Sequence, residues 1–264
     1  MKLVCVVKFV PDVDRFEYDH EKHVLIREGS RMMINPDDGC AIGFALEMKK
    51  RNPEIFIEVL TMAPASVVPL VEDILRVGVD QGTIISDRSY AGSDSWVTSR
   101  ILGRYLATTE YDCILTGSQA IDGDTSHVPP QLGEILGLGQ ISGITKVEED
   151  SFGSESAVVE VDDEEAVTTY ELNLPAILSF SRKSKCRLPH VRFKDRKKDV
   201  TDRIKVLSND ELGFAKGEVG LKGSLTKVAK AYTRKYESGA QLRVAADDNG
   251  VETVLKFLKE KRFL

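Results

Sequence analysis

The sequence predicts an α/β fold built on a doubly wound parallel sheet, with an antiparallel hairpin and an extended C-terminal arm. Two observations carry this prediction. Short apolar runs rich in β-branched residues alternate with segments of helical periodicity over the first half of the chain. Most of these runs are apolar on both faces, as is typical of parallel strands covered by helices on both sides.

Seven strands are expected in chain order. The first apolar run ends at Pro11, and the others end at turn residues or at the start of a helical pattern. One pair of runs alternates apolar and polar residues around an acidic turn, which predicts an antiparallel hairpin. The strands are predicted over 3–10, 55–62, 82–86, 112–117, 156–161, 166–172 and 175–180.

Helix signals stand between these strands. A helix is predicted to begin where Asn35 precedes Pro36, because proline suits the first helical turn and the acidic residues that follow suit the positive end of the helix dipole. Ser66 is expected to cap the next helix and Gly78 to end it. Further helices are expected after the loop 91–95, over 131–137 and over 251–261.

Composition excludes several classes of protein. Hydrophobic residues make up 42% of the 264 residues and charged residues 30%, which supports a packed core. We expect a cytoplasmic protein that does not enter a membrane, because no apolar run approaches the ~18–20 residues of a membrane helix and the N-terminus lacks secretory features. Four scattered cysteines predict neither a disulfide framework nor a metal site. The net charge of −6 argues against a nucleic-acid partner.

The charge is unevenly distributed along the chain. Residues 182–205, here called the basic segment, contain eleven lysines and arginines against three aspartates, and the rest of the chain carries a net charge of −14. This asymmetry has two interpretations. The segment steers the protein toward an acidic partner face, or it is a solvated arm that lies on the acidic remainder of a complex.

Four loops are expected at the carboxyl ends of the strands, where open α/β sheets bind ligands. No strand is followed by a GxGxxG or a Walker lysine motif. In the loop 116–126, Gly123 permits a positive φ, and Thr125 and Ser126 offer hydroxyls and backbone N–H groups at a helix start. Such a helix start is an anion site that suits a pyrophosphate. Alternatively, the Asp-Gly-Asp-Thr run is a turn and an N-cap that serve only the fold.

Three charged or titratable residues leave alternatives open. Asp122 and Asp124 would repel a phosphate at close range, so we place them on ribose hydroxyls, on backbone N–H groups or at the cap. Lys8 meets an anion or a flavin carbonyl at the mouth of the sheet, or it extends to solvent. No nucleophile–base pair or carboxylate pair stands out, so no catalytic residue is assigned. The pattern is that of a protein that holds a nucleotide.

At these positions the sequence resembles the β subunits of electron-transfer flavoproteins over nearly its whole length. The resemblance rests on VCVVKFVPDV at 4–13, INPDD at 34–38, the stretch 76–99, GSQAIDGDTSHVPPQLGEILG at 117–137, the basic stretch 182–199 and KGSLTKVAKAYTRK at 222–235. It implies a Rossmann-like domain that binds a nucleotide or FAD over 1–205, an arm over 206–264 that packs on an α subunit, and electron transfer with a flavin-dependent dehydrogenase of the acyl-CoA or lactate type.

The resemblance leaves two functional branches. Housekeeping members hold a structural AMP in the β subunit. Members of the electron-bifurcating branch, typical of anaerobes, hold FAD there, which exchanges a hydride with NAD(H) and splits the electrons between ferredoxin and the FAD of the α subunit. The chain resembles the bifurcating branch, because Asp122-Gly123-Asp124-Thr125 stands where housekeeping members carry a third Asp and a Cys. A stand-alone nucleotide-binding protein or hydrolase without flavin is the third possibility.

The resemblance also implies a set of site residues. Arg187, Leu188 and Pro189 would dock the dehydrogenase, with Leu188 as the apolar anchor. The sequence departs from the family at Pro129-Pro130, where a Gly-Pro pair is usual. The implied cofactor-binding residues are Val6, Lys8, Asn35, Pro36, Asp37, Met62, Ala63, Asp94, Ser95, Thr98, Gly117, Gln119, Asp122, Gly123, Asp124, Thr125, Ser126, His127, Val128, Pro129, Pro130 and Gln131.

Overall fold

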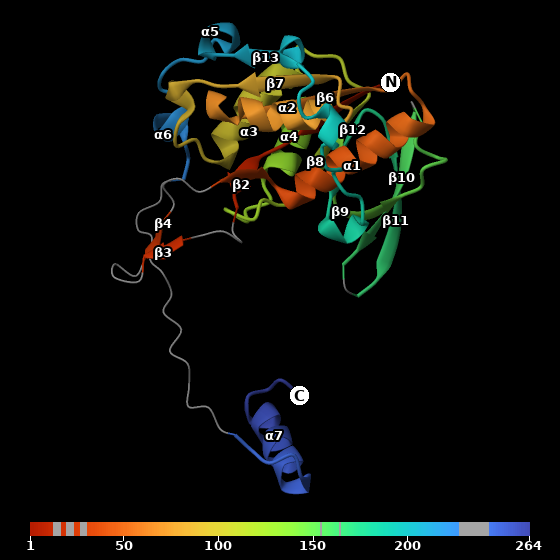
Figure 1. The fold of residues 1–264 in the computed structure, drawn as a ribbon, viewed down its shortest axis with the longest axis vertical. Coiled ribbons are helices and arrows are strands. Elements are labelled where there is room, and N and C mark those ends of the chain that lie inside the picture. Colours follow the sequence, from red (N-terminus) through yellow and green to blue (C-terminus); the bar gives the residue numbers. More distant parts are fainter. Residues whose placement is uncertain (13–16, 20–23, 27–30, 154, 164, 227–242) are drawn as a thin grey trace. The chain divides into compact units, whose positions relative to one another are not determined.

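A computed structural model places the chain in two compact units, Met1–Lys227 and Val228–Leu264 (Figure 1). The structure describes residues 1–12, 17–19, 24–26, 31–153, 155–163, 165–226 and 243–264. The first unit contains the sheet, and the second contains one long helix.

A nine-stranded sheet forms the centre of the first unit, in the order β11-β10-β9-β12-β8-β1-β6-β7-β13. Neighbouring strands from β9 to β13 run parallel, whereas β10 pairs antiparallel with both β9 and β11. The predicted α/β class, with a large and mostly parallel sheet, is therefore confirmed. The strands are β1 (Lys2–Val6), β6 (Phe56–Met62), β7 (Gln81–Ile85), β8 (Cys113–Gly117), β9 (Gly139–Val147), β10 (Ser156–Asp162), β11 (Val167–Asn173), β12 (Ala176–Phe180) and β13 (Ile204–Leu207).

The expected single strand over 3–10 is wrong. β1 ends at Val6, and β2 (Phe9–Pro11) pairs instead with β5 (Met32–Ile34) in a separate antiparallel sheet. The break has a physical reason, since the N–H of Lys8 donates to a side chain, the Asp38 carboxylate, rather than to a neighbouring strand. A second small hairpin pairs β3 (Glu17–Asp19) with β4 (Val24–Ile26).

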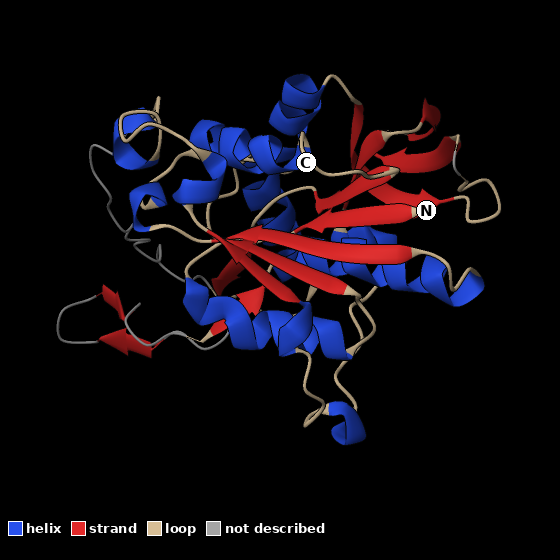
Figure 2. Cartoon of the chain, turned by 90° about the horizontal axis from the view of Figure 1, so that it is seen from above, coloured by secondary structure: helices blue, strands red, loops and turns tan. Residues whose placement is uncertain are grey.

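Helices cover both faces of the large sheet (Figure 2). α1 (Pro36–Arg51) and α2 (Val68–Arg76) pack on one face, and α3 (Ser95–Leu106) and α4 (Val128–Leu136) pack on the other. The two short helices α5 (Asn209–Leu212) and α6 (Gly220–Gly223) follow β13.

Two helix starts differ from the prediction. Ser66 does not cap α2, because it lies inside the 3-10 turn Ala65–Val67, which makes Val67 the residue before the helix. α4 begins at Val128 rather than at residue 131, since its two prolines suit a first helical turn. The strands β9 and β13 were not expected. β13 is an edge strand that begins at the end of the basic segment, with an exposed lysine and an exposed valine among its four residues.

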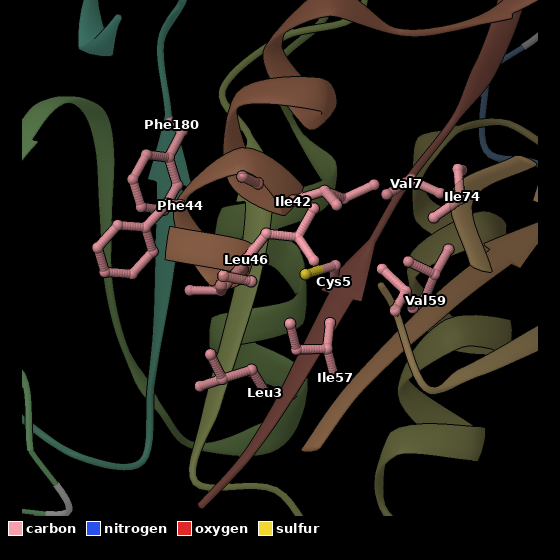
Figure 3. Close-up of a cluster of buried hydrophobic side chains, with 14 of the residues drawn as sticks. Leu3, Cys5, Val7, Ile42, Phe44, Leu46, Ile57, Val59, Ile74 and Phe180 are labelled. Carbon is pink, nitrogen blue, oxygen red and sulfur yellow. The ribbon is translucent and has the colours of Figure 1, made fainter. Parts of the chain in front are cut away.

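The core consists of two apolar layers, one on each face of the sheet. On the face of α1, Leu3 and Cys5 pack with Ile57 and with residues of α1 (Figure 3). On the other face, Val4 joins residues of α3 and α4. Successive residues of β1 therefore enter opposite layers, as the two-residue period of a strand requires. Full burial of a leucine, isoleucine or valine side chain in these layers stabilises the fold by about 1.5–3 kcal/mol.

The second unit contains α7 (Asp248–Glu260), which confirms the predicted last helix. Asp247 accepts a hydrogen bond from the N–H of Gly250 and caps its start. The apolar residues Val251, Val254, Leu255 and Leu258 follow one another at helical spacing. The first three of them are exposed in the unit as described. None of the described helices has the length and apolarity that a bilayer-spanning helix needs.

Candidate functional site

The strand order changes direction beside β1. From β1 the chain steps outward to β6 and β7, and it then returns to β8 on the other side of β1. Ligands of open α/β sheets bind beyond the carboxyl ends of the strands at such a point. The residues that follow β1 and β8 are therefore the first place to look for a site.

Asp38, near the start of α1, bridges the ends of these two strands. One carboxylate oxygen accepts the N–H of Lys8 at 2.7 Å, and the other accepts the N–H of Gly117 at 2.8 Å. A Cβ on Gly117 would lie 2.3 Å from Asp38 Oδ1, so only glycine fits there. Burial raises the pKa of Asp38 to about 7, against the hydrogen bonds, which lower it. Asp38 was not among the predicted site residues, and its signal in the sequence is that it is the second acid of INPDD.

Asn35 clamps the loop that follows β8. Its amide Nδ2 donates to the carbonyl of Gln119 at 2.7 Å, and its Oδ1 accepts the N–H of Ile121 at 3.2 Å. The residue is 1% exposed. The Asn35 side chain makes no capping hydrogen bond with α1. It instead fixes the loop 117–124 against the start of that helix.

Lys8 and the Asp-Gly-Asp-Thr run meet at the mouth of the sheet. Lys8 Nζ lies 2.7 Å from Asp122 Oδ1, and the lysine side chain is half exposed. Gly123 could adopt a positive φ but does not, and the positive values fall on Asp124 (50°) and Ser126 (53°) instead. Left-handed backbone at a residue with a side chain costs of order 1 kcal/mol and is typical of functional loops.

The backbone beyond this run presents consecutive donors. Within the described part of the chain, the N–H groups of residues 125–128 have no acceptor. A series of free N–H groups near a helix start forms an anion-binding concavity. The next two residues, Pro129 and Pro130, carry no N–H, and the N–H of Gln131 donates to the carbonyl of His127 at 3.1 Å. The donors therefore end at Val128.

The start of α3 contacts both this loop and the end of the first unit. Asp94 Oδ1 accepts the N–H of Val97 at 3.0 Å, and Asp94 Oδ2 accepts the N–H and the hydroxyl of Thr226 at 2.9 and 3.1 Å. Burial acts to raise the pKa of Asp94, but these hydrogen bonds outweigh it and hold the pKa below its usual value. Both oxygens of this expected cofactor ligand are thus used within the chain.

Two further contacts join α3 to the loop and to α4. Ser95 Oγ lies 3.5 Å from Nδ1 of His127, at the limit of a hydrogen bond. Ser99 donates to Oε1 of Gln131 at 2.9 Å. Ser99 was not expected as a site residue, since its spacing marks only the buried face of α3. Thr98 lies on the same turn and donates its N–H to the carbonyl of Asp94.

The remaining predicted residues surround the ends of β1 and β6. Val6 is buried, whereas Met62 and Ala63 are half-buried at the end of β6. Asp37 is buried, and its Oδ1 lies 3.2 Å from Nε of the exposed Arg182. Burial raises the pKa of Asp37, and the guanidinium of Arg182 acts against that rise. Pro36 is the first residue of α1.

Two of the three expected docking residues, Arg187 and Leu188, pack against α1. Leu188 is half-buried, with its Cβ 3.7 Å from where a Cβ on Gly39 would stand. The backbone of Arg187 would lie 2.7 Å from a Cβ on Gly43, so this glycine permits the close approach. Pro189 is exposed.

The described residues contain no group of three or more His, Cys, Asp or Glu arranged to hold a metal ion. At this site both oxygens of the buried Asp38 carboxylate accept backbone N–H groups, and the N–H groups of residues 125–128 are the donors left without an acceptor among the described residues. No nucleophile with an oriented base is part of it.

Comparison with known proteins assigns the family. The family model described as "Electron transfer flavoprotein domain" matches residues 22–206. The chain is 29% identical over its full length to the "Electron transfer flavoprotein subunit beta" of Thermoanaerobacterium thermosaccharolyticum, which is also covered fully. It is 28% identical, again over the full length of both chains, to the "Caffeyl-CoA reductase-Etf complex subunit CarD" of Acetobacterium woodii and to the "Acryloyl-CoA reductase electron transfer subunit gamma" of Anaerotignum propionicum. The chain therefore belongs to the electron transfer flavoprotein family.

Proposed function

We propose that this chain is the β subunit of an electron-bifurcating electron-transfer flavoprotein and that it holds FAD beyond the ends of β1 and β8. The observation that carries the proposal is the run of four backbone N–H groups at 125–128 that have no acceptor among the described residues, shortly after Asp122, which pairs with Lys8. A pyrophosphate needs such a series of donors and a nearby cation.

The residues at the site fit a dinucleotide. The N–H groups of 125–128 would hold the pyrophosphate, Asn35 to Asp37 and the end of β6 would flank the adenosine, and Lys8 would meet an anionic or carbonyl oxygen. Asn35 and Asp38 hold the loop 117–124 in place, so that these donors are oriented before the ligand arrives. When bound, FAD would supply hydride exchange with NAD(H) and transfer of single electrons to ferredoxin and to the FAD of the α subunit.

Gly123 supports FAD over the AMP of housekeeping β subunits. Its φ is not positive, and a Cβ there would meet nothing in the described chain closer than Lys8 Nζ at 4.0 Å. The fold of the chain therefore does not require glycine at this position, whereas a ligand lying against the loop would. The relatives named as parts of caffeyl-CoA and acryloyl-CoA reductases favour a flavin-dependent dehydrogenase of the acyl-CoA type as the partner.

The α subunit is the second proposed partner. The apolar stripe of α7 is exposed in its own unit and would be buried against that subunit. We place the heterodimer in the cytoplasm, with ferredoxin as a further electron carrier and with neither nucleic acid nor membrane as a partner. The net charge of −6 argues against a nucleic-acid partner.

The deciding experiment is the FAD and AMP content of the heterodimer. We expect two FAD per heterodimer, one of them bleached by NADH, together with NADH-dependent reduction of ferredoxin. One FAD plus one AMP would refute bifurcation and make the chain a housekeeping β subunit. A stable monomer with ATPase activity and no flavin would refute both branches.

A further inference from the structure

We propose that Asp38 takes up a proton from solvent when the anionic cofactor binds, so that the affinity of the cofactor site rises as the pH falls through neutrality. The inference rests on the proposed function, because it describes how that same site responds to pH. Asp38 is a positioning residue and not a ligand of the cofactor, because both of its carboxylate oxygens contact the backbone of the strand ends.

Asp38 joins the two strand ends from which the cofactor loops depart. Its carboxylate oxygens accept the N–H of Lys8 at 2.7 Å and the N–H of Gly117 at 2.8 Å. The carbonyl of Lys8 in turn accepts the N–H of Asn35 at 2.9 Å, so the start of α1 fixes both backbone groups of Lys8. The loop after Gly117 leads to the N–H groups of 125–128 that have no described acceptor. A change in the charge of Asp38 therefore acts on the residues that would hold the cofactor.

The carboxylate of Asp38 is buried without a cation. The residue is 6% exposed, and no lysine, arginine or histidine in the described part of the chain forms an ion pair with it. Lys8 contacts Asp38 through its backbone, whereas its ammonium pairs with Asp122 at 2.7 Å. The negative charge of Asp38 is therefore stabilised by hydrogen bonds and not by an opposite charge.

The other titratable groups that face Asp38 do not supply that opposite charge. On its own helix, Asp37 adds a second negative charge and is itself paired with Arg182. On β1, the Cys5 thiol is fully buried, and burial together with the charge of Asp38 raises its pKa, so the thiol stays neutral. From β8, Asp38 receives the backbone N–H of Gly117. A proton is the cation that remains able to neutralise this carboxylate.

The charged and neutral forms of Asp38 are close in free energy near neutral pH. Burial raises the pKa of its carboxyl to about 7, against the hydrogen bonds from Lys8, Gly117 and Asn35, which lower it. An anion bound at the N–H groups of 125–128 would raise this pKa further, since a nearby negative charge disfavours a second one. By thermodynamic linkage, the proton strengthens anion binding by the same factor as the anion strengthens proton binding. Nucleotide affinity therefore rises as the pH falls and Asp38 becomes protonated.

The size of the effect follows from the pKa of Asp38 in the free and the occupied site. If a bound anion raises it from about 7 to about 8, the nucleotide Kd at about pH 6 is about fivefold lower than at about pH 8. Under the same conditions, each nucleotide takes up about half a proton near pH 7.5. Both quantities are large enough to measure.

His127 is the other group that would respond to an anion at this loop. It directly precedes α4, is exposed, and is one of the residues whose N–H has no described acceptor. Histidine changes its charge near neutral pH, so protonation of its side chain would also favour an anion. Asp38 is the stronger candidate because its charge is buried, whereas solvent and salt screen the charge of an exposed side chain. The test separates the two residues.

The test measures proton uptake by the flavin-depleted heterodimer, using calorimetry in two buffers that differ in their protonation enthalpy, together with Kd values at about pH 6, 7 and 8. The probes are FAD and ADP-ribose, because each carries a pyrophosphate diester whose charge is constant over this range. We expect the wild type to take up about half a proton and Asp38→Asn, whose amide stays neutral, to take up much less and to bind with a nearly constant Kd. The FAD site of the α subunit is the same in all samples and cancels in the difference between variants.

Asp73→Asn is the matched control, because it makes the same substitution at an exposed carboxyl of α2 that pairs with Arg76. This variant should keep the proton uptake of the wild type. The wild type alone would overturn the inference if it bound FAD without proton uptake and with the same Kd at about pH 6 and pH 8. Uptake that persists in Asp38→Asn, or that is lost equally in Asp73→Asn, would also overturn it. Uptake that is lost in His127→Gln and kept in Asp38→Asn would assign the proton to His127 instead.

Cofactor content, measured on the same preparations before flavin is removed, distinguishes failure of the proposed function from failure of this inference. AMP in place of the second FAD would refute the proposed function, yet proton uptake on ADP-ribose binding that depends on Asp38 would still support the linkage. Two FAD per heterodimer with no proton uptake would refute the linkage and leave the proposed function in place.

Discussion

Replacing Gly123 with alanine separates a requirement of the ligand from a requirement of the fold. The added methyl group would approach no described atom closer than Lys8 Nζ at 4.0 Å, and the φ of Gly123 is not positive. The free energy of unfolding should therefore stay the same or rise by about 0.4–1 kcal/mol, since alanine restricts the unfolded chain. If the cofactor lies against this loop, the same methyl group costs about 1–3 kcal/mol of binding, as overpacking does in a filled site. A loss of 1.4 kcal/mol is about tenfold in affinity.

The assay is a fluorescence titration of the flavin-depleted heterodimer with FAD, run beside thermal unfolding of the same protein without ligand. Gly217→Ala is the matched control, because a Cβ on Gly217 meets nothing within 4 Å and its φ is also not positive. We expect the FAD Kd to rise only in Gly123→Ala, with both variants as stable as the wild type. Equal FAD affinity in the two variants would refute the idea that a ligand lies against Gly123. A lower thermal stability of Gly123→Ala would show that the fold itself needs glycine there.

Three further predictions follow from the contacts of Asp38, Lys2 and Asp94. Burial raises the pKa of Asp38 to about 7, so the protonated carboxyl favours the folded state and its ionisation opposes folding. The stability that the protonated carboxyl contributes is fully present below about pH 4 and is lost as the pH rises to about 7. Chemical denaturation should thus show the wild type losing about 3 kcal/mol more than Asp38→Asn between pH 5 and pH 8, and parallel pH profiles would contradict this. Lys2→Met removes the cation 2.8 Å from the fully buried Glu58 and should cost about 3 kcal/mol of unfolding free energy, most of it recovered when Glu58→Gln is added; no recovery would place the loss elsewhere. Asp94→Asn can still cap α3 through its amide oxygen, but the amide nitrogen then faces Thr226 and cannot accept a hydrogen bond from it. Hydrogen exchange at the Thr226 amide should therefore become about tenfold faster without a change in global stability. Unchanged protection of that amide would count against the contact.

The parallel strands could be predicted because strands buried in the sheet have mostly apolar sequences. The runs at 55–62 and 112–117 are mostly apolar and mostly buried, and they correspond to β6 and β8 within about one residue. β13 escaped prediction because half of its four residues are exposed at the sheet edge, which leaves no apolar run to detect. Lys8 divides the first apolar run in two, and the cause lies 30 positions along the chain, at Asp38. No local pattern reveals such a partner.

The loops that form the candidate site could be predicted from the sequence, but the contacts between their residues could not. That the loops after β1 and β8 meet follows from the parallel order of the strands, and Lys8, Asn35 and Gly117 do lie together there. The individual interactions were not predictable from propensity. Asparagine is a common N-cap residue, yet the Asn35 side chain hydrogen-bonds to the backbone of Gln119 and Ile121, which lie 84 and 86 positions further along the chain. An amide serves either purpose equally well, and only the tertiary fold decides which donors and acceptors come within its reach.

The clearest case is Asp94, where a resemblance indicates one use of a side chain and the structure gives another. Its carboxylate caps α3 and accepts hydrogen bonds from Thr226, the last described residue of the first unit, while the hydroxyl of the adjacent Ser95 lies 3.5 Å from His127 of the loop beyond β8. One helical turn thus contacts both the proposed cofactor loop and the end of the first unit. Because these contacts arise from neighbouring residues, a change in cofactor content after substitution of Asp94 would not by itself identify a ligand contact. Only variants that spare Thr226, such as Ser95→Ala, separate the two roles.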